Sequence, residues 1–177
     1  AVGALDRSHK RMDYVVAEVA QMRLRPHLLL LGAETPETPA VRALAAELLG
    51  DRCTVRTLSR VDTRLAYRAA DAFVLASLAE GFGLVQVEAL DAGLPCVVHD
   101  TTTSAYVLGP HGVRADLRAN GALAPILDHV LAAGMGDSRA RHDWAWNAFS
   151  WDRLARRYVA LLVACAAGGR PEFTAAT

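Results

Sequence analysis

The sequence contains a single lysine, few cysteines and no net charge, and the charge balance and the cysteines each argue against particular classes of protein. Nineteen Lys and Arg side chains balance nineteen Asp and Glu side chains, which argues against a general nucleic-acid-binding protein because such proteins need an excess of positive charge. The three cysteines, Cys53, Cys96 and Cys165, are odd in number, and no two of them stand in C-x-x-C spacing. They predict small buried side chains in a reducing compartment, with neither a zinc site nor a disulfide framework.

Long hydrophobic runs are also missing. The segment 159–167 is apolar for only nine residues, well short of the roughly 20 that a membrane-spanning helix needs. The chain of 177 residues is 53% hydrophobic and 21% charged, the composition of a globular domain with a full-sized core. Because the opening letters AVGAL look like a strand already under way, we expect residue 1 to be a cut point inside a longer protein.

Apolar segments of strand length alternate with helix-periodic segments through the first part of the chain. The expected strands are 1–3, 27–31, 53–58, 72–76, 95–99 and a weaker 113–115. The expected helices between them are 12–22, 39–49, 63–69 and 84–92. Most of the strands are continuously apolar, as strands covered on both faces are. The pattern predicts an α/β fold, a single Rossmann-like, doubly wound parallel sheet of about six strands with helices on both faces.

After Leu117 the pattern becomes purely helical. The expected C-terminal helices are 120–133, 138–149 and 151–167, with Ser150 as the N-cap of the last. We therefore predict one domain over 1–167, followed by a flexible tail over 168–177. Ligands of such sheets bind beyond the carboxyl ends of the strands, and the segments expected there are 3–11, 32–37, 59–62, 77–83 and 100–104.

The stretch SLAEGFGLVQVEALDAGLPCVV, residues 77–98, places Gly81 and Gly83 between an expected strand and an expected helix. One hypothesis is a dinucleotide-binding turn, with Asp100 as the ribose-binding acid. Against it, Gln86 occupies the position of the third glycine, and the turn follows the fourth expected strand instead of the first. A second hypothesis is an ordinary tight turn with Glu80 and Glu88 as solvated surface charges.

A third hypothesis gives the glycines and both glutamates one purpose. Gly81 and Gly83 allow the backbone to approach a ligand, and the start of the helix at Leu84 presents free N–H groups to a polyanion such as a nucleoside diphosphate. Glu88, one turn into the helix, can accept two hydrogen bonds from a ribose diol, and Glu80 can hold sugar hydroxyls.

At this point the residues show a resemblance. The stretch 77–98 resembles the E-x7-E segment of the family 4 (group 1) glycosyltransferases, which are retaining enzymes of the GT-B fold. The likeness continues elsewhere in the chain. AVGALDRSHK, PHLLLLG, YRAADAFVLAS and FSWDRLARRYVALL are similar to successive segments of the family's C-terminal, donor-binding domain.

The resemblance implies roles for particular residues. Glu80 would face the donor sugar and Glu88 would bind the ribose, with the backbone of Gly81, Phe82, Gly83 and Leu84 contacting the sugar. Lys10 matches the family's lysine, which binds the diphosphate and stabilises the charge that grows on the leaving nucleotide. Glu80 and Lys10 are thus the expected catalytic residues. Arg60, in the segment that follows the third strand, is expected near the nucleobase.

The chain also departs from the family pattern. Ala4 stands where the resemblance implies a diphosphate-binding arginine, which leaves Arg7 or Arg11 as candidates to supply the charge. HDTTTSAYVLG, residues 99–109, lacks the usual glycine pair and Pro-Glu. Thr102 is a candidate donor-binding residue there, although this threonine-rich segment can equally cap a helix. We expect His99 to be a structural histidine.

The resemblance implies transfer of a sugar from a nucleoside diphosphate sugar to a hydroxyl acceptor, without a metal or other cofactor. The expected partners are the donor and an N-terminal acceptor domain absent from this chain, so that the fragment alone is expected to be inactive. The expected location is cytoplasmic, and the basic face of Arg153, Arg156 and Arg157 is a candidate for contact with the inner membrane face. The alternatives are a non-catalytic binding or assembly module and another GT-B enzyme, such as a nucleotide-sugar epimerase.

Overall fold

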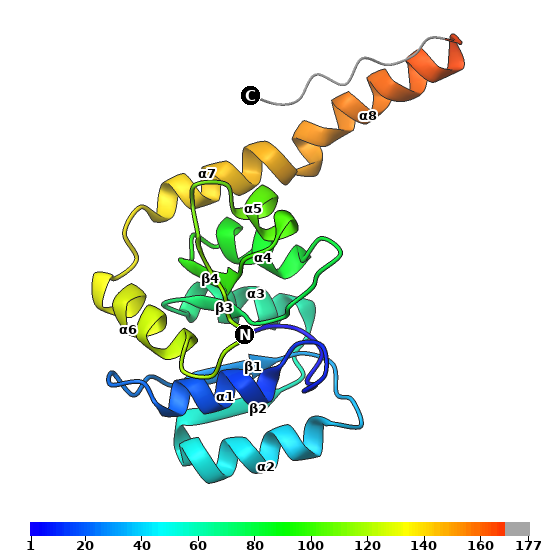
Figure 1. The fold of residues 1–177 in the computed structure, drawn as a ribbon. Coiled ribbons are helices and arrows are strands. Elements are labelled where there is room, and N and C mark those ends of the chain that lie inside the picture. Colours follow the sequence, from blue (N-terminus) through cyan, green and yellow to red (C-terminus); the bar gives the residue numbers. More distant parts are fainter. Residues whose placement is uncertain (169–177) are drawn as a thin grey trace.

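Strands and helices alternate along the chain as the sequence predicts, and the computed structural model describes residues 1–168 (Figure 1). Its elements are α1 (Met12–Ala20), β1 (Leu28–Leu31), α2 (Thr38–Leu49), the 3-10 turn η1 (Gly50–Arg52), β2 (Cys53–Arg56), α3 (Arg60–Ala69), β3 (Phe73–Leu75), α4 (Leu84–Asp91), β4 (Cys96–His99), α5 (Thr102–Leu108), β5 (Val113–Ala115), α6 (Leu123–Ala133), α7 (Ser138–Phe149) and α8 (Trp151–Ala166). The predicted α/β class is confirmed. Most of the predicted tail, 169–177, lies outside the described residues.

All strand pairs are parallel, but the strands form two groups instead of one ladder. β1 pairs with β2, and β4 pairs with β3 on one side and β5 on the other. Successive side chains of β3 and β4 alternate between two cores: Val74 and Val97 face one, whereas Leu75 and Val98 face the other. Helices α1, α2 and α6 contribute to the first core and α3, α4, α5 and α7 to the second, so that helices cover both faces.

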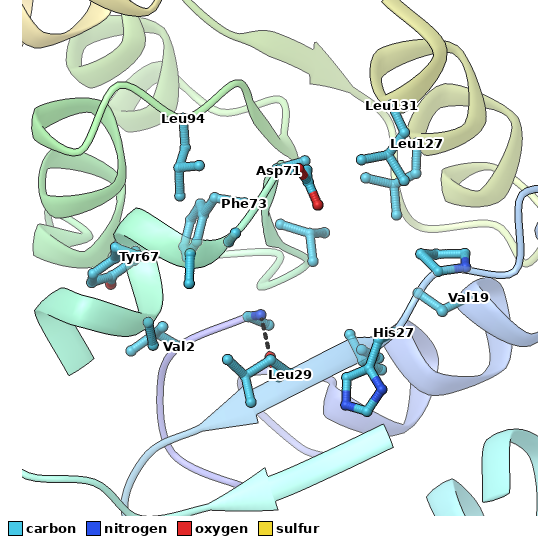
Figure 2. Close-up of a pocket in the computed structure, with 18 of the residues that line it drawn as sticks. Val2, Val19, His27, Leu29, Tyr67, Asp71, Phe73, Leu94, Leu127 and Leu131 are labelled. Atoms are coloured by element: carbon cyan, nitrogen blue, oxygen red, sulfur yellow. Dashed lines mark hydrogen bonds between the residues drawn. The ribbon is translucent and has the colours of Figure 1, made fainter. Parts of the chain in front are cut away.

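The expected first strand and the count of about six strands are wrong for the described residues. Of the segment 1–3, Val2 alone makes a bridge, to Leu31, so that five strands and one bridge form instead of six strands. The flanking hydrogen bonds join Ala1 and Gly3 to the β1 side only. This contact continues to Leu5, whose backbone N–H donates to the carbonyl oxygen of Ala33, whereas among residues 1–168 no backbone hydrogen bond joins residues 1–3 to β3. Between β1 and β3 lies an apolar cavity of about 360 Å³ (Figure 2).

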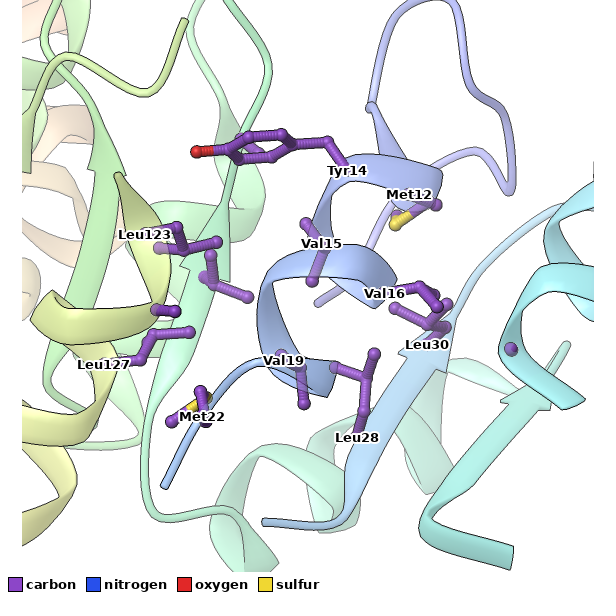
Figure 3. Packing of buried hydrophobic residues seen from close by; sticks show 14 of the residues in the cluster. Met12, Tyr14, Val15, Val16, Val19, Met22, Leu28, Leu30, Leu123 and Leu127 are labelled. Carbon is purple, nitrogen blue, oxygen red and sulfur yellow. The ribbon is translucent and has the colours of Figure 1, made fainter. Parts of the chain in front are cut away.

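The larger core joins the N-terminal half to α6 (Figure 3). Val15 and Val19 of α1 lie between Leu28 of β1 and Leu127 of α6, and all four side chains are buried. The adjoining polar link is Glu18, whose buried carboxylate accepts hydrogen bonds from the backbone N–H groups of Gly121, Leu123 and Ala124. Glu18 therefore supplies acceptors to the N–H groups at the start of α6, although it belongs to α1, more than 100 residues earlier in the sequence.

Several helix boundaries differ from those predicted. α3 begins at Arg60, three residues before the expected start, because the Ser59 side chain accepts a hydrogen bond from the Asp62 backbone N–H and caps the helix. α6 begins at Leu123 instead of residue 120, since residues 120–122 form a turn in which the backbone N–H of Gly121 donates to Glu18. Ser150 stands at the N-cap position of α8 but makes no side-chain cap hydrogen bond. α8 has no buried residue and extends away from the rest of the molecule (Figure 1).

Candidate functional site

Two loops from distant parts of the sequence meet at the carboxyl edge of the strands. The first leads from Val2 into α1, and the second leads from β3 into α4. Lys10 Nζ of the first loop lies 2.5 Å from Glu80 Oε1 of the second, and both side chains are almost buried. His9 Nε2 lies 3.2 Å from the carbonyl oxygen of Ala79 in the same loop. The fold thus brings together Lys10 and Glu80, the two residues that the sequence predicts to be catalytic.

The loop that carries Lys10 is held by carboxylates. Asp6 Oδ1 accepts hydrogen bonds from the backbone N–H groups of His9, at 3.0 Å, and Lys10, at 2.5 Å. Glu37, at the start of α2, accepts from the backbone N–H groups of Arg7, at 2.7 Å, and Ser8, at 3.1 Å. The bond from Arg7, followed by that from Ser8, holds the pKa of Glu37 below its ordinary value. The backbone before Lys10 is therefore fixed from both sides.

The glycine turn brings free backbone donors beside Glu80. Gly83 is the N-cap of α4 with φ of 75°, in the left-handed region that favours glycine. A Cβ at this position would lie 2.2 Å from Nε2 of the buried Gln86. Among residues 1–168, the backbone N–H groups of residues 81–85 have no acceptor. The start of α4 thus offers a row of N–H groups to an anion.

Glu88 lies one turn further along α4, on an exposed part of the helix. Its Oε2 accepts a hydrogen bond of 3.0 Å from the hydroxyl of Tyr67 in α3. Burial, together with the charge of Glu88 and this bond, raises the pKa of Tyr67 far above its ordinary value, so that the hydroxyl stays protonated and donating. Tyr67 thus fixes one carboxylate oxygen, and nothing in the sequence indicates this pairing.

The electrostatics of Glu80 are set by opposing effects. Burial alone would raise the pKa of its carboxyl group, but the hydrogen bond from Lys10, followed by the neighbouring Ser77 hydroxyl, the charge of Lys10 and a contribution from His9, outweighs it and holds the pKa below the ordinary 4.5. Glu80 is therefore ionised near neutral pH. A carboxylate can accept hydrogen bonds from sugar hydroxyls but cannot donate a proton to them.

The other predicted residues border this site in different ways. Arg60 is exposed in the first turn of α3, and Thr102 is exposed in the first turn of α5. Thr101 and Ser104 form a reciprocal capping box at the start of α5, which confirms the capping hypothesis for these two residues. Thr102 is left outside that cap.

Three further residues have structural partners. His99 is buried, and its Nδ1 accepts a hydrogen bond from the backbone N–H of Leu117, which confirms the expected structural role. Arg7 pairs with Asp13 at the surface, at 3.2 Å. Asp100, the ribose-binding acid of the dinucleotide hypothesis, forms an ion pair of 2.6 Å with Arg114.

The apolar cavity between β1 and β3 shares one residue with the candidate site, Tyr67, the hydrogen-bond partner of Glu88 (Figure 2). The cavity is lined by residues that include Leu29, Phe73 and Leu127, and by none of the residues that the sequence predicts at the site. Over residues 1–168 we find no cluster of His, Cys, Asp and Glu side chains able to hold a metal ion. In the same residues no helix is both long and apolar enough to cross a membrane.

Comparisons with known proteins bear on the family and the fold. The family model described as glycosyl transferases group 1 matches residues 1–133. Sucrose-phosphate synthase from Thermosynechococcus elongatus is 26% identical with a TM-score of 0.84, over 95% of this chain and 46% of its own. HepE of Anabaena, in a structure with UDP and glucose, is 20% identical with a TM-score of 0.80, over 92% of this chain and 48% of its own.

A glycosyltransferase from Rickettsia africae is 18% identical with a TM-score of 0.75, over 90% of this chain and 46% of its own. No curated protein sequence matches the chain. In all three comparisons with solved structures, the chain spans less than half the length of the other protein.

Proposed function

Because the chain belongs to the group 1 glycosyltransferases and has the fold of one half of a GT-B enzyme, we propose that it is the donor-binding domain of a retaining sugar transferase. The observation that carries the proposal is the contact between Lys10 Nζ and Glu80 Oε1, formed beside the free N–H groups that start α4. A cation and backbone donors suit a diphosphate, and carboxylates suit sugar and ribose hydroxyls. The structure of HepE with UDP and glucose supports a nucleoside diphosphate sugar as the donor class.

In the proposed reaction each residue has one task. Lys10 and the N–H groups of residues 81–85 hold the diphosphate and stabilise the charge that grows on it. Glu80 holds sugar hydroxyls and Glu88 holds the ribose diol. The bond between the anomeric carbon and the diphosphate oxygen breaks, and the acceptor oxygen bonds to the same face of that carbon. Because the new bond forms on the face that the diphosphate leaves, the configuration is retained, and the acceptor proton passes to the leaving phosphate oxygen.

The acceptor, in this proposal, binds to a second domain, and the reacting groups are assembled only when both domains are present. The fragment alone should therefore bind a nucleotide but turn over little or no substrate. A reaction without metal, a cytoplasmic location and a membrane contact through Arg153, Arg156 and Arg157 stay predictions.

A non-catalytic binding module is the second candidate, and one observation favours it. The resemblance implies two cations at the diphosphate, but Ala4 carries no charge and Arg7 pairs with Asp13. Such a module would bind the nucleotide without assembling a transferase.

Calorimetric titration of the chain with UDP, GDP and ADP, with NAD as the control ligand, tests the proposal. We expect one of the diphosphates to bind and NAD not to, and we expect Lys10→Ala and Glu88→Ala each to weaken binding about tenfold or more. Glu47→Ala, on the exposed face of α2, is the matched control and should bind as the parent chain does. A folded chain that binds none of the diphosphates contradicts the proposal. Transfer activity of the two-domain protein distinguishes an enzyme from a binding module.

A further inference from the structure

Arg11 lies where three loops meet, in a backbone conformation that arginine seldom adopts. Its φ of 52° and ψ of 44° are left-handed, and it occupies the N-cap position of α1 without making a side-chain cap. This conformation is unfavourable for a residue with a Cβ. Its persistence requires compensating contacts, which the side chain supplies.

Those contacts span the carboxyl edge of the strands. Arg11 Nη1 donates to the carbonyl oxygen of Ala76, at 3.2 Å, and to that of Leu117, at 2.7 Å. The guanidinium carbon also lies 4.1 Å from the centre of the Tyr14 ring. Ala76 and Leu117 are buried, so that both carbonyl oxygens would lack a partner without Arg11.

The two acceptors lead directly to the candidate site. Ala76 follows β3 and begins the loop that carries Glu80, whereas Leu117 follows β5. The backbone N–H of Leu117 donates to His99 at the end of β4, which adds a third strand to the connection. One side chain, adjacent to Lys10, thus ties the first loop to the ends of β3 and β5.

The remaining side-chain hydrogen bonds between residues 3–11 and 76–83, within the described part of the chain, are His9 with Ala79 and Lys10 with Glu80. In the proposed function, a bound donor draws Lys10 to the diphosphate and Glu80 to the sugar. If the loops were held together by that ion pair, binding would release them at the moment when their spacing matters. The Arg11 contacts do not need to change.

We propose that Arg11 is a positioning residue, which keeps the loop of Lys10 at a fixed distance from the loop of Glu80 while both residues exchange partners on donor binding; this inference rests on the proposed function. A planar guanidinium with several N–H donors suits two carbonyl oxygens on different loops, and a lysine ammonium on a flexible stem does not fix such geometry equally well. Arg11 itself does not touch the donor.

The experiment compares Arg11→Gly with Arg25→Gly. Arg25 also has a left-handed φ, of 49°, but it is exposed, and among residues 1–168 its side chain has no hydrogen-bond partner. Both substitutions relieve the unfavourable left-handed backbone conformation, but only Arg11→Gly removes side-chain hydrogen bonds between loops. The readouts are the melting temperature, the UDP affinity by calorimetry, and the carboxyl pKa of Glu80 by carbon NMR of the ligand-free protein.

We expect Arg25→Gly to leave both the UDP affinity and the pKa of Glu80 unchanged. Arg11→Gly should weaken UDP binding about tenfold or more and move the pKa of Glu80 up toward its ordinary value, because Lys10 is held less firmly. Arg11→Lys should fall between the parent and Arg11→Gly in both readouts.

An Arg11→Gly chain that melts earlier but keeps the parent's UDP affinity and Glu80 pKa would show a merely structural role and overturn the inference. If Arg11→Gly does not fold, Arg11→Lys is judged by the same two readouts. If the parent chain binds no nucleoside diphosphate, the proposed function fails by itself. The pKa of Glu80 in the ligand-free variants still decides whether Arg11 sets the spacing of the loops.

Discussion

The ammonium of Lys10 and the carboxylate of Glu80 lie 2.5 Å apart, although 70 residues separate them in the sequence. Their side chains are only 13% and 11% exposed, so that each charge depends on the other for compensation. The exposed pair of Arg42 and Glu34 has the same 2.5 Å separation with side chains 43% and 55% exposed. Solvent screens that second pair, which makes it a natural reference for the first.

Lys10→Met should destabilise the chain by about 1–3 kcal/mol near neutral pH, because Glu80 is left largely buried without a counter-charge. In the parent, the pKa of Glu80 lies below 4.5, so its contribution to stability is complete above that pH and is lost as the pH falls through the lowered pKa. In the variant, burial without Lys10 raises the pKa of Glu80 above its ordinary value. The buried carboxylate then takes up a proton as the pH falls toward 4.5, and the chain regains stability. Urea unfolding over this pH range measures the difference.

The control for this experiment is Arg42→Met, which removes a charge from the exposed pair. We expect it to change the free energy of unfolding by less than about 1 kcal/mol. A Lys10→Met effect as small as that of Arg42→Met, or one that does not shrink on acidification, would show that the ion pair in the ligand-free protein is loose.

Glu88→Ala should remove the preference for a ribose diol. The parent should bind UDP about tenfold or more tightly than 2′,3′-dideoxy-UDP, because hydrogen bonds to a carboxylate are strong, and the variant should bind both equally. Tyr67→Phe should reduce the preference by a smaller factor, since it removes the 3.0 Å bond that fixes Glu88 but keeps the ring that packs against Phe73. Calorimetry with both nucleotides checks this, and a Glu88→Ala chain that still discriminates refutes the ribose role.

The two glycines of the turn should respond differently to alanine. Gly83→Ala should destabilise the chain by about 1–3 kcal/mol, because φ is 75° and the new Cβ would lie 2.2 Å from the Gln86 amide. A Cβ at the exposed Gly81 meets no atom within 4 Å, and Gly81→Ala should change stability by less than about 0.5 kcal/mol. Thermal unfolding of the two variants compares them, and equal losses would mean that the turn has another conformation.

Glu18→Ala should be among the most damaging substitutions outside the candidate site. It leaves the N–H groups of Gly121, Leu123 and Ala124 without their acceptor, at a cost of about 3 kcal/mol or more. Glu18→Gln should recover part of the loss because its amide oxygen still accepts, and the exposed Glu47→Ala provides the baseline. Denaturant unfolding measures all three, and a small effect of Glu18→Ala would show that water replaces the carboxylate.

Local elements of the fold could be predicted closely from the sequence. The strands predicted at 27–31 and 95–99 correspond to β1 and β4, each one residue shorter at its start, and the turn from Glu80 to Gly83 leads directly into α4. Thr101 and Ser104 cap α5 at a spacing that the sequence displays. These features depend on neighbouring residues, whose conformational preferences act within a few positions.

The errors occurred where distant contacts or a specific cap decide the outcome. α3 begins early because the Ser59 side chain meets the Asp62 backbone. The first expected strand is only a bridge at Val2, which pairs with Leu31 and makes no ladder with β3. Strand pairing of this kind depends on how layers pack, which periodicity does not encode.

The sequence by itself determined the α/β class, the family resemblance and the identity of the acidic and basic residues at the candidate site. Only the tertiary structure decided which of them meet: that Lys10 pairs with Glu80, that Tyr67 holds Glu88, and that Arg11 connects the loops after β3 and β5. The physical reason is that short-range preferences select helices, strands and turns, whereas these partners are separated by 21 to 106 residues. Their contacts form only after burial of the apolar faces has brought the carboxyl ends of the strands to one edge.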